Sequence, residues 1–298
     1  MRRRIAGFLL PALLTGAISA CASSAVNLGP HTIKLLLAYK QGQVYRYHFS
    51  FTLNGTTTSA VQSVPTNASM SATEAMTATS VDSAGIVTLD ITIENAAMTI
   101  NGRSTPVPGA ATHAQMKVGR DGRIISGGAL AGGAGAGPSI PGTNQLTPLL
   151  PDHDIKPGDT WTKQVDQPNP FGSGTINAST SNKYLRDQAF NGHQDAVIES
   201  KSMVPLNLTF DYATMARALG LSSQLSRFPQ LASLQISYRG SSTGDTTAEL
   251  NKGTGEMDAT HMLASFDATM TFAGTAGSPL AGQTIPFKGT ITVDLKRV

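Results

Sequence analysis

The residues Asp152-His153-Asp154 come nearest to a metal-binding cluster in this sequence. Imidazole nitrogens and carboxylate oxygens both bind divalent cations, so three such side chains in a row could contribute to a metal site. The group lies between Pro151 and Pro157, however, in a stretch whose prolines are typical of an exposed turn. No other group of histidines and acids lies close to it in the sequence. We therefore predict a solvated turn here, and neither a metal ion nor another cofactor.

Two other catalytic signatures are missing from the sequence. The sequence has no S-x-x-K pair that would activate a serine and no H-E-x-x-H that would hold zinc beside a general base. Paired carboxylates such as Asp90 and Glu94 lack the aromatic surroundings of a glycosidase site. The remaining histidines are scattered along the chain: His31, His48, His113, His193 and His261. No residue argues for an enzyme, although a site assembled from distant positions stays open.

The N-terminal residues carry the strongest functional signal. Arg2, Arg3 and Arg4 precede an apolar run from Ile5 to Ala20, and Cys21 follows. A basic segment, a short apolar core and small residues before a cleavage site are typical of a secretory signal peptide, here residues 1–20. A transmembrane anchor is disfavoured because the run is shorter than the ~20 residues that span a bilayer.

Cys21 is the only cysteine of the 298-residue chain. The residues Ile18-Ser-Ala-Cys21 resemble the bacterial lipobox, in which the cysteine is diacylated and becomes the first mature residue. A lone free thiol is unusual in an exported protein, so lipid attachment at Cys21 explains the residue economically, with cleavage alone as the alternative. We expect an exported protein whose lipid anchors it to the cell membrane or outer membrane, on the periplasmic or extracellular face.

Removal of the signal peptide changes the charge balance. The whole chain has 22 Lys+Arg and 19 Asp+Glu, and the three N-terminal arginines account for the excess of +3. The mature chain is therefore neutral and lacks the basic surplus that attracts nucleic acid or anionic headgroups. We expect no nucleic-acid partner, and the sequence identifies no protein partner.

Alternation of apolar and polar residues predicts a mainly β fold of antiparallel sheets. Residues Tyr45 to Leu53 and Val87 to Ile93 place apolar side chains at every second position, as half-buried strands do. Ile33 to Tyr39 is predicted to be a further strand. Turns are predicted at Asn54-Gly55 and Asn191-Gly192. We expect a curved half-barrel or a sandwich.

The segment 127–148, rich in glycine, alanine and proline, divides the chain. We predict a linker or loop, because it contains no G-x-G-x-x-G and the chain has no Gly-Lys pair that could cradle a phosphate. Residues 21–30 would form a tether, residues 31–126 a first β half and residues 149–298 a second β half.

The two halves begin alike. Gly42-Gln-Val-Tyr45 opens the first, and Gly158-Asp-Thr-Trp161 follows the stretch Leu149 to Pro157 in the second. The similarity suggests two related halves from a degenerate duplication, although a generic run of hairpins would look similar. In either case Trp161 is predicted to be a core anchor at the start of a strand.

One short helical insert is predicted at about residues 211–227. Asp211 can cap it, and apolar residues follow at helical spacing. Four apolar residues of this insert are candidates for contact with a ligand: Met215, Leu219, Leu225 and Phe228. Such an insert could cover one end of a curved sheet and enclose a cavity for a lipid-like molecule. The alternative is that these side chains only complete the core.

Several segments together resemble bacterial secreted lipoproteins of a family of unknown function. They are the lipobox, the segments Leu37 to Tyr47 and Ser80 to Leu89, and the mid-chain element Leu150 to Trp161. The resemblance implies an exported lipoprotein and brings no catalytic residues with it. Lipoprotein carriers of the periplasm and lipid-binding lipoproteins offer an analogy at the level of the fold alone.

These observations lead to one expectation about function and two alternatives. We expect a membrane-anchored lipoprotein that binds an apolar or lipid-like ligand, or an envelope component, without catalysis. An envelope scaffold or protein-interaction role is the first alternative. A hydrolase with a dispersed site is the second.

Overall fold

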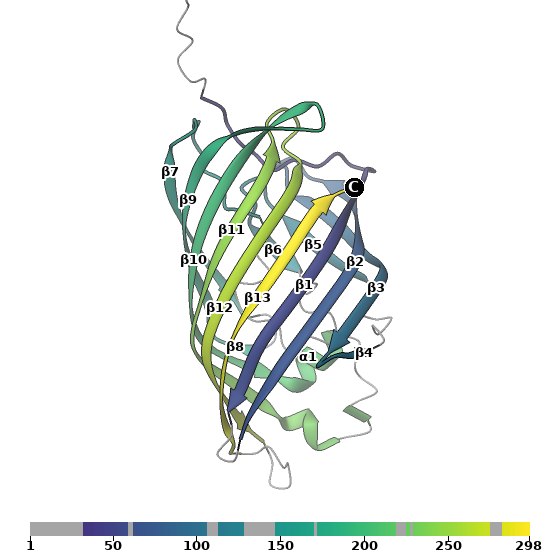
Figure 1. Cartoon of the computed structure of the whole chain (residues 1–298), viewed down its shortest axis with the longest axis vertical. Coiled ribbons are helices and arrows are strands. Elements are labelled where there is room, and N and C mark those ends of the chain that lie inside the picture. Colours follow the sequence, from purple (N-terminus) through teal and green to yellow (C-terminus); the bar gives the residue numbers. More distant parts are fainter. Residues whose placement is uncertain are drawn as a thin grey trace, which may run out of the picture. The chain divides into compact units, whose positions relative to one another are not determined.

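Alternating side chains build one large antiparallel sheet, seen in the computed structural model of the chain (Figure 1). The structure describes the following residues: 32–58, 62–105, 113–127, 147–169, 172–218, 225–226, 229–274 and 282–298. The predicted signal peptide, Cys21 and the tether 21–30 lie outside these residues, as does most of the segment 127–148. Among the described residues, no helix has the length and apolar character needed to cross a bilayer.

The described strands follow the chain in two runs. The first run comprises β1 (Val44–Thr58), β2 (Ser63–Val81), β3 (Val87–Ile100), β4 (Arg103–Thr105), β5 (His113–Val118) and β6 (Ile124–Gly127). The second comprises β7 (Thr160–Pro168), β8 (Gly172–Ser173), β9 (Thr175–Phe190), β10 (His193–Asp211), β11 (Gln235–Asn251), β12 (Met257–Ala273) and β13 (Thr284–Arg297). At ~3.3 Å per residue, the 19-residue strands β2 and β10 are about 60 Å long.

The sheet is open and joins both runs of strands. Its order is β6-β5-β3-β2-β1-β13-β12-β11-β10-β9-β7, so the described part of the sheet ends at β6 on one side and at β7 on the other. The last strand, β13, pairs with the first, β1, in a register that sets Phe51 opposite Val293. The mainly β, antiparallel prediction is confirmed, and both predicted halves lie in one sheet. No observation tests whether they arose by duplication.

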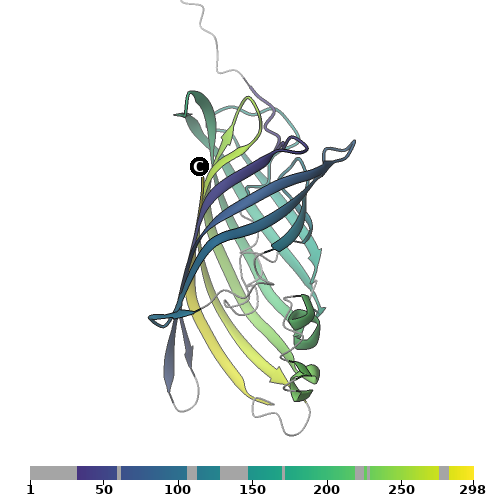
Figure 2. The same cartoon turned by 90° about the vertical axis from the view of Figure 1, so that its right-hand side faces the viewer.

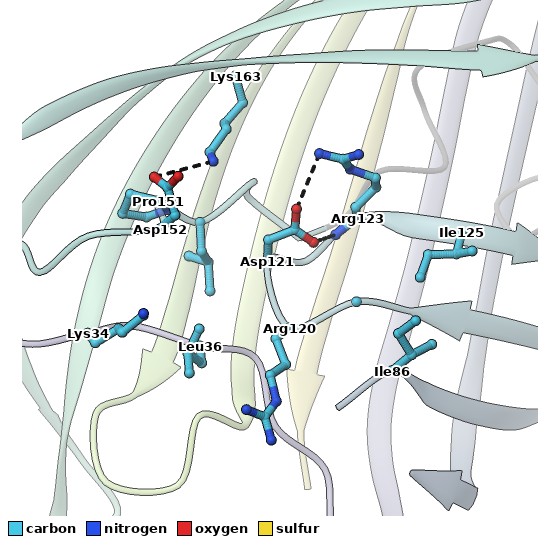
Figure 3. A pocket seen from close by; sticks show the side chains of 12 residues that line it. Lys34, Leu36, Ile86, Arg120, Asp121, Arg123, Ile125, Pro151, Asp152 and Lys163 are labelled. Atoms are coloured by element: carbon cyan, nitrogen blue, oxygen red, sulfur yellow. Dashed lines mark hydrogen bonds and ion pairs between the residues drawn. The ribbon is translucent and has the colours of Figure 1, made fainter. Parts of the chain in front are cut away.

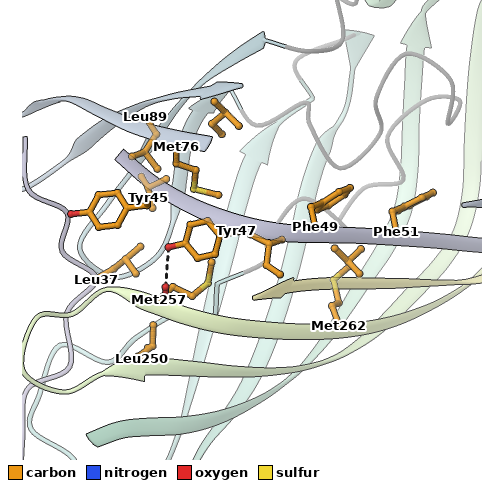
Figure 4. Close-up of a cluster of buried hydrophobic side chains, with 14 of the residues drawn as sticks. Leu37, Tyr45, Tyr47, Phe49, Phe51, Met76, Leu89, Leu250, Met257 and Met262 are labelled. Carbon is orange, nitrogen blue, oxygen red and sulfur yellow. Dashed lines mark hydrogen bonds between the residues drawn. The ribbon is translucent and has the colours of Figure 1, made fainter. Parts of the chain in front are cut away.

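One face of the sheet, which we call the inner face, carries the buried side chains. Phe49, Phe51 and Leu53 alternate along β1 with more exposed neighbours, as the sequence predicted. Figure 4 shows Phe49 and Phe51 projecting from the same side of β1, and the main apolar cluster continues from there onto β13 and β12. The sheet curves about this face (Figure 2). Burial of these apolar side chains is the main stabilising contribution to the fold.

The predicted strand from Ile33 to Tyr39 is wrong. Only Ile33 forms a β-bridge, with Ile155, and the rest is an extended segment outside the sheet. The backbone of this segment forms hydrogen bonds with loops at the ends of the strands. The amide of Leu37, for example, donates to the carbonyl of Arg120 at 2.8 Å. Apolar residues alternate in this segment because an extended chain that lies across the strand ends also buries every second side chain.

The predicted turn at Asn54-Gly55 is also wrong, because β1 continues through it to Thr58. Gly55 pairs with Gly289 of β13 and Thr66 of β2. A Cβ atom at Gly55 would lie 2.9 Å from the ring of Phe287. The glycine therefore makes room for an aromatic ring rather than a turn. At Asn191-Gly192, both residues have positive φ and the predicted turn is confirmed.

Within the predicted helical insert, the described residues 212–218 and 225–226 are helical. The helix α1 spans Tyr212–Ala218, and the amide of Thr214 donates to the Asp211 carboxylate at 2.8 Å, as a capping residue requires. A second short element, the 3-10 helix η3 (Pro229–Ser233), precedes β11. Leu231 lies in this element.

Candidate functional site

The middle of the inner face combines three glycines with two phenylalanines. Two successive rows of residues, paired across β10, β11, β12, β13 and β1, show this. The first row is Val204, Ser242, Phe266, Gly289 and Gly55, and the second is Leu206, Gly240, Ala268, Phe287 and Thr57. At inward positions, Gly55 and Gly289 leave room that neighbouring aromatic rings occupy.

Two aromatic rings lie over Gly55 and Gly289 of these rows. The Phe266 and Phe287 rings are stacked, with centroids 4.6 Å apart and planes at 29°. The space that a Cβ atom of Gly289 would occupy is 2.7 Å from Cζ of Phe266, while Phe287 covers Gly55. Glycine thus allows the rings to lie close to the backbone. The result is an aromatic patch, formed by Phe266 and Phe287, in the middle of the inner face.

Phe266 of this patch is buried, whereas Phe287 and several apolar side chains nearer α1 are only partly buried. Phe287 packs against the main core cluster, yet keeps part of its surface accessible. Ile176, Met270 and Phe272 do the same at the end of the sheet nearer α1. Toward the opposite end, Tyr47 and Val293 are completely buried. One group of partly buried apolar side chains on the inner face therefore lies on the α1 side of the sheet.

Only one of the four predicted ligand-contacting side chains can be placed. Leu225 is half-buried. Met215 belongs to α1, but its side chain lies outside the described part of the structure, as do Leu219 and Phe228. Contact between these four residues and a ligand stays a prediction. Just after the predicted insert, Leu231 of η3 packs with the apolar cluster around Phe210.

At the end of the sheet where β10 and β12 begin, buried charges gather. Nε2 of His193 lies 2.7 Å from Oδ2 of Asp258 and 3.1 Å from Oδ1 of Asp195. Nη1 of Arg297 donates to Asp258 at 3.1 Å and to Glu256 at 2.6 Å. Both aspartates are completely buried. We call His193, Asp195, Asp258, Glu256 and Arg297 the ionic cluster.

Burial raises the pKa of two carboxyl groups, those of Asp195 and Glu74. Desolvation, followed by the nearby Asp258 carboxylate, raises the pKa of Asp195 to about 6. Desolvation raises the pKa of Glu74, which pairs with Tyr47 across β1 and β2, to about 7. Each group therefore resists ionisation in the folded protein, because its negative charge is poorly solvated.

The sequence analysis missed the ionic cluster. His193-x-Asp195 follows the Asn191-Gly192 turn, and residues two apart in a strand share a face. That spacing was the available signal. Asp258 could not be linked to it from the sequence, because β11 lies between β10 and β12.

The group Asp152-His153-Asp154 forms an exposed turn, as predicted. It borders an open pocket of about 530 Å³, whose lining comes from both edge regions of the sheet (Figure 3). Lys163 of β7 reaches toward Asp152 at 3.8 Å, and Arg123 reaches Asp121 at 3.4 Å. Acids partner these two cations, whereas Lys34 and Arg120 leave the lining with a net charge of +2, from four cations and two acids.

One stretch has the spacing of a serine-hydrolase motif. Gly240-Ser-Ser-Thr-Gly244 matches G-x-S-x-G, in which the serine of a hydrolase stands on a sharp strand-to-helix turn. Here all five residues lie inside β11 and pair continuously with β10 and β12. Ser242 is buried within the sheet. The stretch therefore lacks the exposed turn that would activate this serine.

Comparisons with known proteins give little further guidance. No family model and no curated protein matches the chain. The fold weakly resembles a solved structure of lipovitellin concerned with its lipid–protein interactions, at a TM-score of 0.40 and 10% identity, over 87% of this chain and 25% of that one. The chain thus spans about a quarter of that protein's length. A structure of DynF, from the dynemicin pathway of Micromonospora chersina, matches at a TM-score of 0.22 and 5% identity, over 90% and 86% of the two chains.

Proposed function

We propose that this chain binds an apolar, lipid-like ligand on the inner face of its sheet, over the aromatic patch of Phe266 and Phe287. The stacked rings above Gly55 and Gly289 are the observation that carries the proposal. Aromatic side chains bury a large apolar area in a contact. Binding sites for small molecules are typically lined by such apolar and aromatic side chains.

The ligand would extend from the aromatic patch along the partly buried apolar side chains of the inner face. Phe287, Met270 and Phe272 lie along the strands from the aromatic patch toward α1 and η3. An elongated apolar molecule lying along this line would cover surface that these side chains leave accessible. Burial gains roughly 25 cal/mol per Å² of apolar surface, so a chain of several methylene groups would bind measurably.

The proposal includes export and membrane attachment. In this account, Cys21 is acylated and becomes the first residue of the mature chain, and its lipid tethers the protein to the cell membrane or outer membrane. The lipobox-like residues Ile18-Ser-Ala-Cys21 and the lone cysteine support it. A tethered protein that holds an apolar ligand would keep that ligand next to a bilayer.

Titration of the full chain, purified in detergent and then delipidated, with a fluorescent fatty acid tests ligand binding. We expect saturable binding that Phe287→Ser weakens about tenfold or more, because loss of a partly buried phenylalanine side chain forfeits on the order of 1.5 kcal/mol. Leu263→Ser is the matched control, since Leu263 is 43% exposed on β12. Non-saturable binding, or equal affinity in both variants, would refute the proposed site.

A further inference from the structure

We propose that His193, Asp195 and Asp258 bind a divalent transition-metal ion, with Zn²⁺ as the ion that these ligands fit best. One atom from each side chain, an imidazole nitrogen or a carboxylate oxygen, lies within 4.8 Å of the other two. The three residues come from the start of β10 and the start of β12. The inference is independent of ligand binding at the aromatic patch.

The carboxylate of Asp195 is the observation that points to a missing ligand. The residue is completely buried, and neither of its carboxylate oxygens accepts a hydrogen bond in the structure. Its nearest cationic group is His193, whose Nε2 is shared with Asp258. A buried carboxylate normally has several hydrogen-bond donors, so two unsatisfied oxygens beside a histidine indicate a place for a cation.

The charge balance of the ionic cluster favours the same conclusion. Asp195, Asp258 and Glu256 are three buried carboxylates, and Arg297 is the permanent cation that contacts two of them. With His193 neutral, the ionised cluster would have a net charge of −2. A divalent cation would neutralise it, and a neutral imidazole is the form that ligates metal.

The donor types narrow the choice of ion. Mg²⁺ and Ca²⁺ prefer sites made entirely of oxygen, whereas Zn²⁺ accepts imidazole nitrogen together with carboxylate oxygen. Zinc ligands lie about 2.0–2.2 Å from the metal, so neighbouring ligand atoms in a tetrahedral site are about 3.4 Å apart. The observed separations of 2.7 and 3.1 Å would widen slightly as the ion enters. The side chain of His193 is 32% exposed, which provides a route from solvent.

Bound metal would connect two strands that are not neighbours. β10 and β12 are separated by β11, and the register shift opposite Glu249 and Leu250 leaves Asp258 as an extra residue on β12. This β-bulge is where Asp258 meets His193. A metal ion there would fix the hairpin between β9 and β10 against the turn that leads into β12.

Zinc binding by the full chain, stripped with a chelator, tests the proposal. We expect a single high-affinity Zn²⁺ by calorimetry, with Mg²⁺ failing to compete. His193→Gln and Asp195→Asn should each weaken it by at least about tenfold, because even loss of an outer-shell partner costs 10–100-fold in affinity. His261→Gln is the matched control: His261 also contacts an aspartate, at 2.6 Å from Asp294, but that pair is exposed.

Cobalt provides a readout that does not depend on any variant. Co²⁺ added to the stripped wild-type protein should give the visible absorption of a four- or five-coordinate ion, and Zn²⁺ should abolish it. No Zn²⁺ uptake together with no Co²⁺ spectrum would overturn the proposal. Unchanged affinity in His193→Gln and Asp195→Asn, alongside a loss in His261→Gln, would overturn it as well.

Discussion

His193 and Asp258 lie 65 positions apart in the chain, and their side chains meet at 2.7 Å. β10 carries the histidine, β12 carries the aspartate, and β11 runs between them. The contact depends on the bulge that makes Asp258 an extra residue opposite Glu249 and Leu250. A local irregularity in pairing thus brings two buried polar groups together at the end of an otherwise regular sheet.

Glu74 should make the protein less stable as pH rises. Its pKa is raised from 4.5 to about 7, so the folded state binds more protons than the unfolded state between these values. Stability from this group is complete below pH 4.5 and declines as pH rises to about 7, by on the order of 3 kcal/mol. Urea unfolding over a pH series should show Glu74→Gln to be more stable than wild type at pH 8, with no such difference near pH 4.5.

Glu94 provides the control for that series. It is a glutamate of the adjacent strand β3, and its side chain is 37% exposed and paired with Arg46. Replacement by glutamine should change stability by less than about 1 kcal/mol at any pH. An equal effect of Glu74→Gln at pH 4.5 and pH 8 would contradict the assigned role of buried charge.

Gly289 should tolerate no side chain. A Cβ atom there would lie 2.4 Å from the backbone oxygen of Asn54 and 2.7 Å from the Phe266 ring. Gly289→Ala should therefore destabilise the protein by about 1–3 kcal/mol, the usual cost of overpacking. Gly253→Ala is the control, because its nearest neighbour would be at 3.4 Å and the change should be much smaller. Similar denaturation midpoints for the two variants would show that the close approach is unimportant.

The sequence was most informative where one strand face is buried and the other is not. The strict alternation from Tyr45 to Leu53 predicted β1, and positive φ at Asn191 and Gly192 agrees with the predicted turn. The same rules failed at Gly55, because glycine serves close packing as well as turns. They failed at Ile33 to Tyr39, because burial in an extended segment does not require a sheet neighbour.

The candidate sites could be predicted less well than the strands. Phe266 and Phe287 were visible as apolar residues, but their stacking depends on the β12–β13 register and on Gly55 and Gly289. The pairing of His193 with Asp258 depends on a bulge. Strand register and β-bulges depend on the packing of the whole sheet. An alternating pattern in the sequence predicts a strand, but it predicts neither the register of that strand nor its bulges.

Cys21→Ser should release the protein from the membrane. If Cys21 is acylated, the wild-type chain will fractionate with membranes and incorporate labelled palmitate in a bacterial host that carries the lipidation enzymes, whereas the variant will do neither. Ser23→Ala is the control, since it changes a neighbouring residue without removing the thiol. Membrane fractionation of Cys21→Ser equal to that of wild type would contradict lipid attachment at this residue.

Photocrosslinking with a diazirine-bearing fatty acid tests the central claim most directly, because it reports where an apolar ligand lies. Peptide mapping of the labelled full chain should place the crosslinks on inner-face residues around Phe266 and Phe287, and an excess of unlabelled fatty acid should suppress them. Crosslinks distributed over outward-facing residues such as Leu263, or labelling that no excess suppresses, would contradict ligand binding at the aromatic patch.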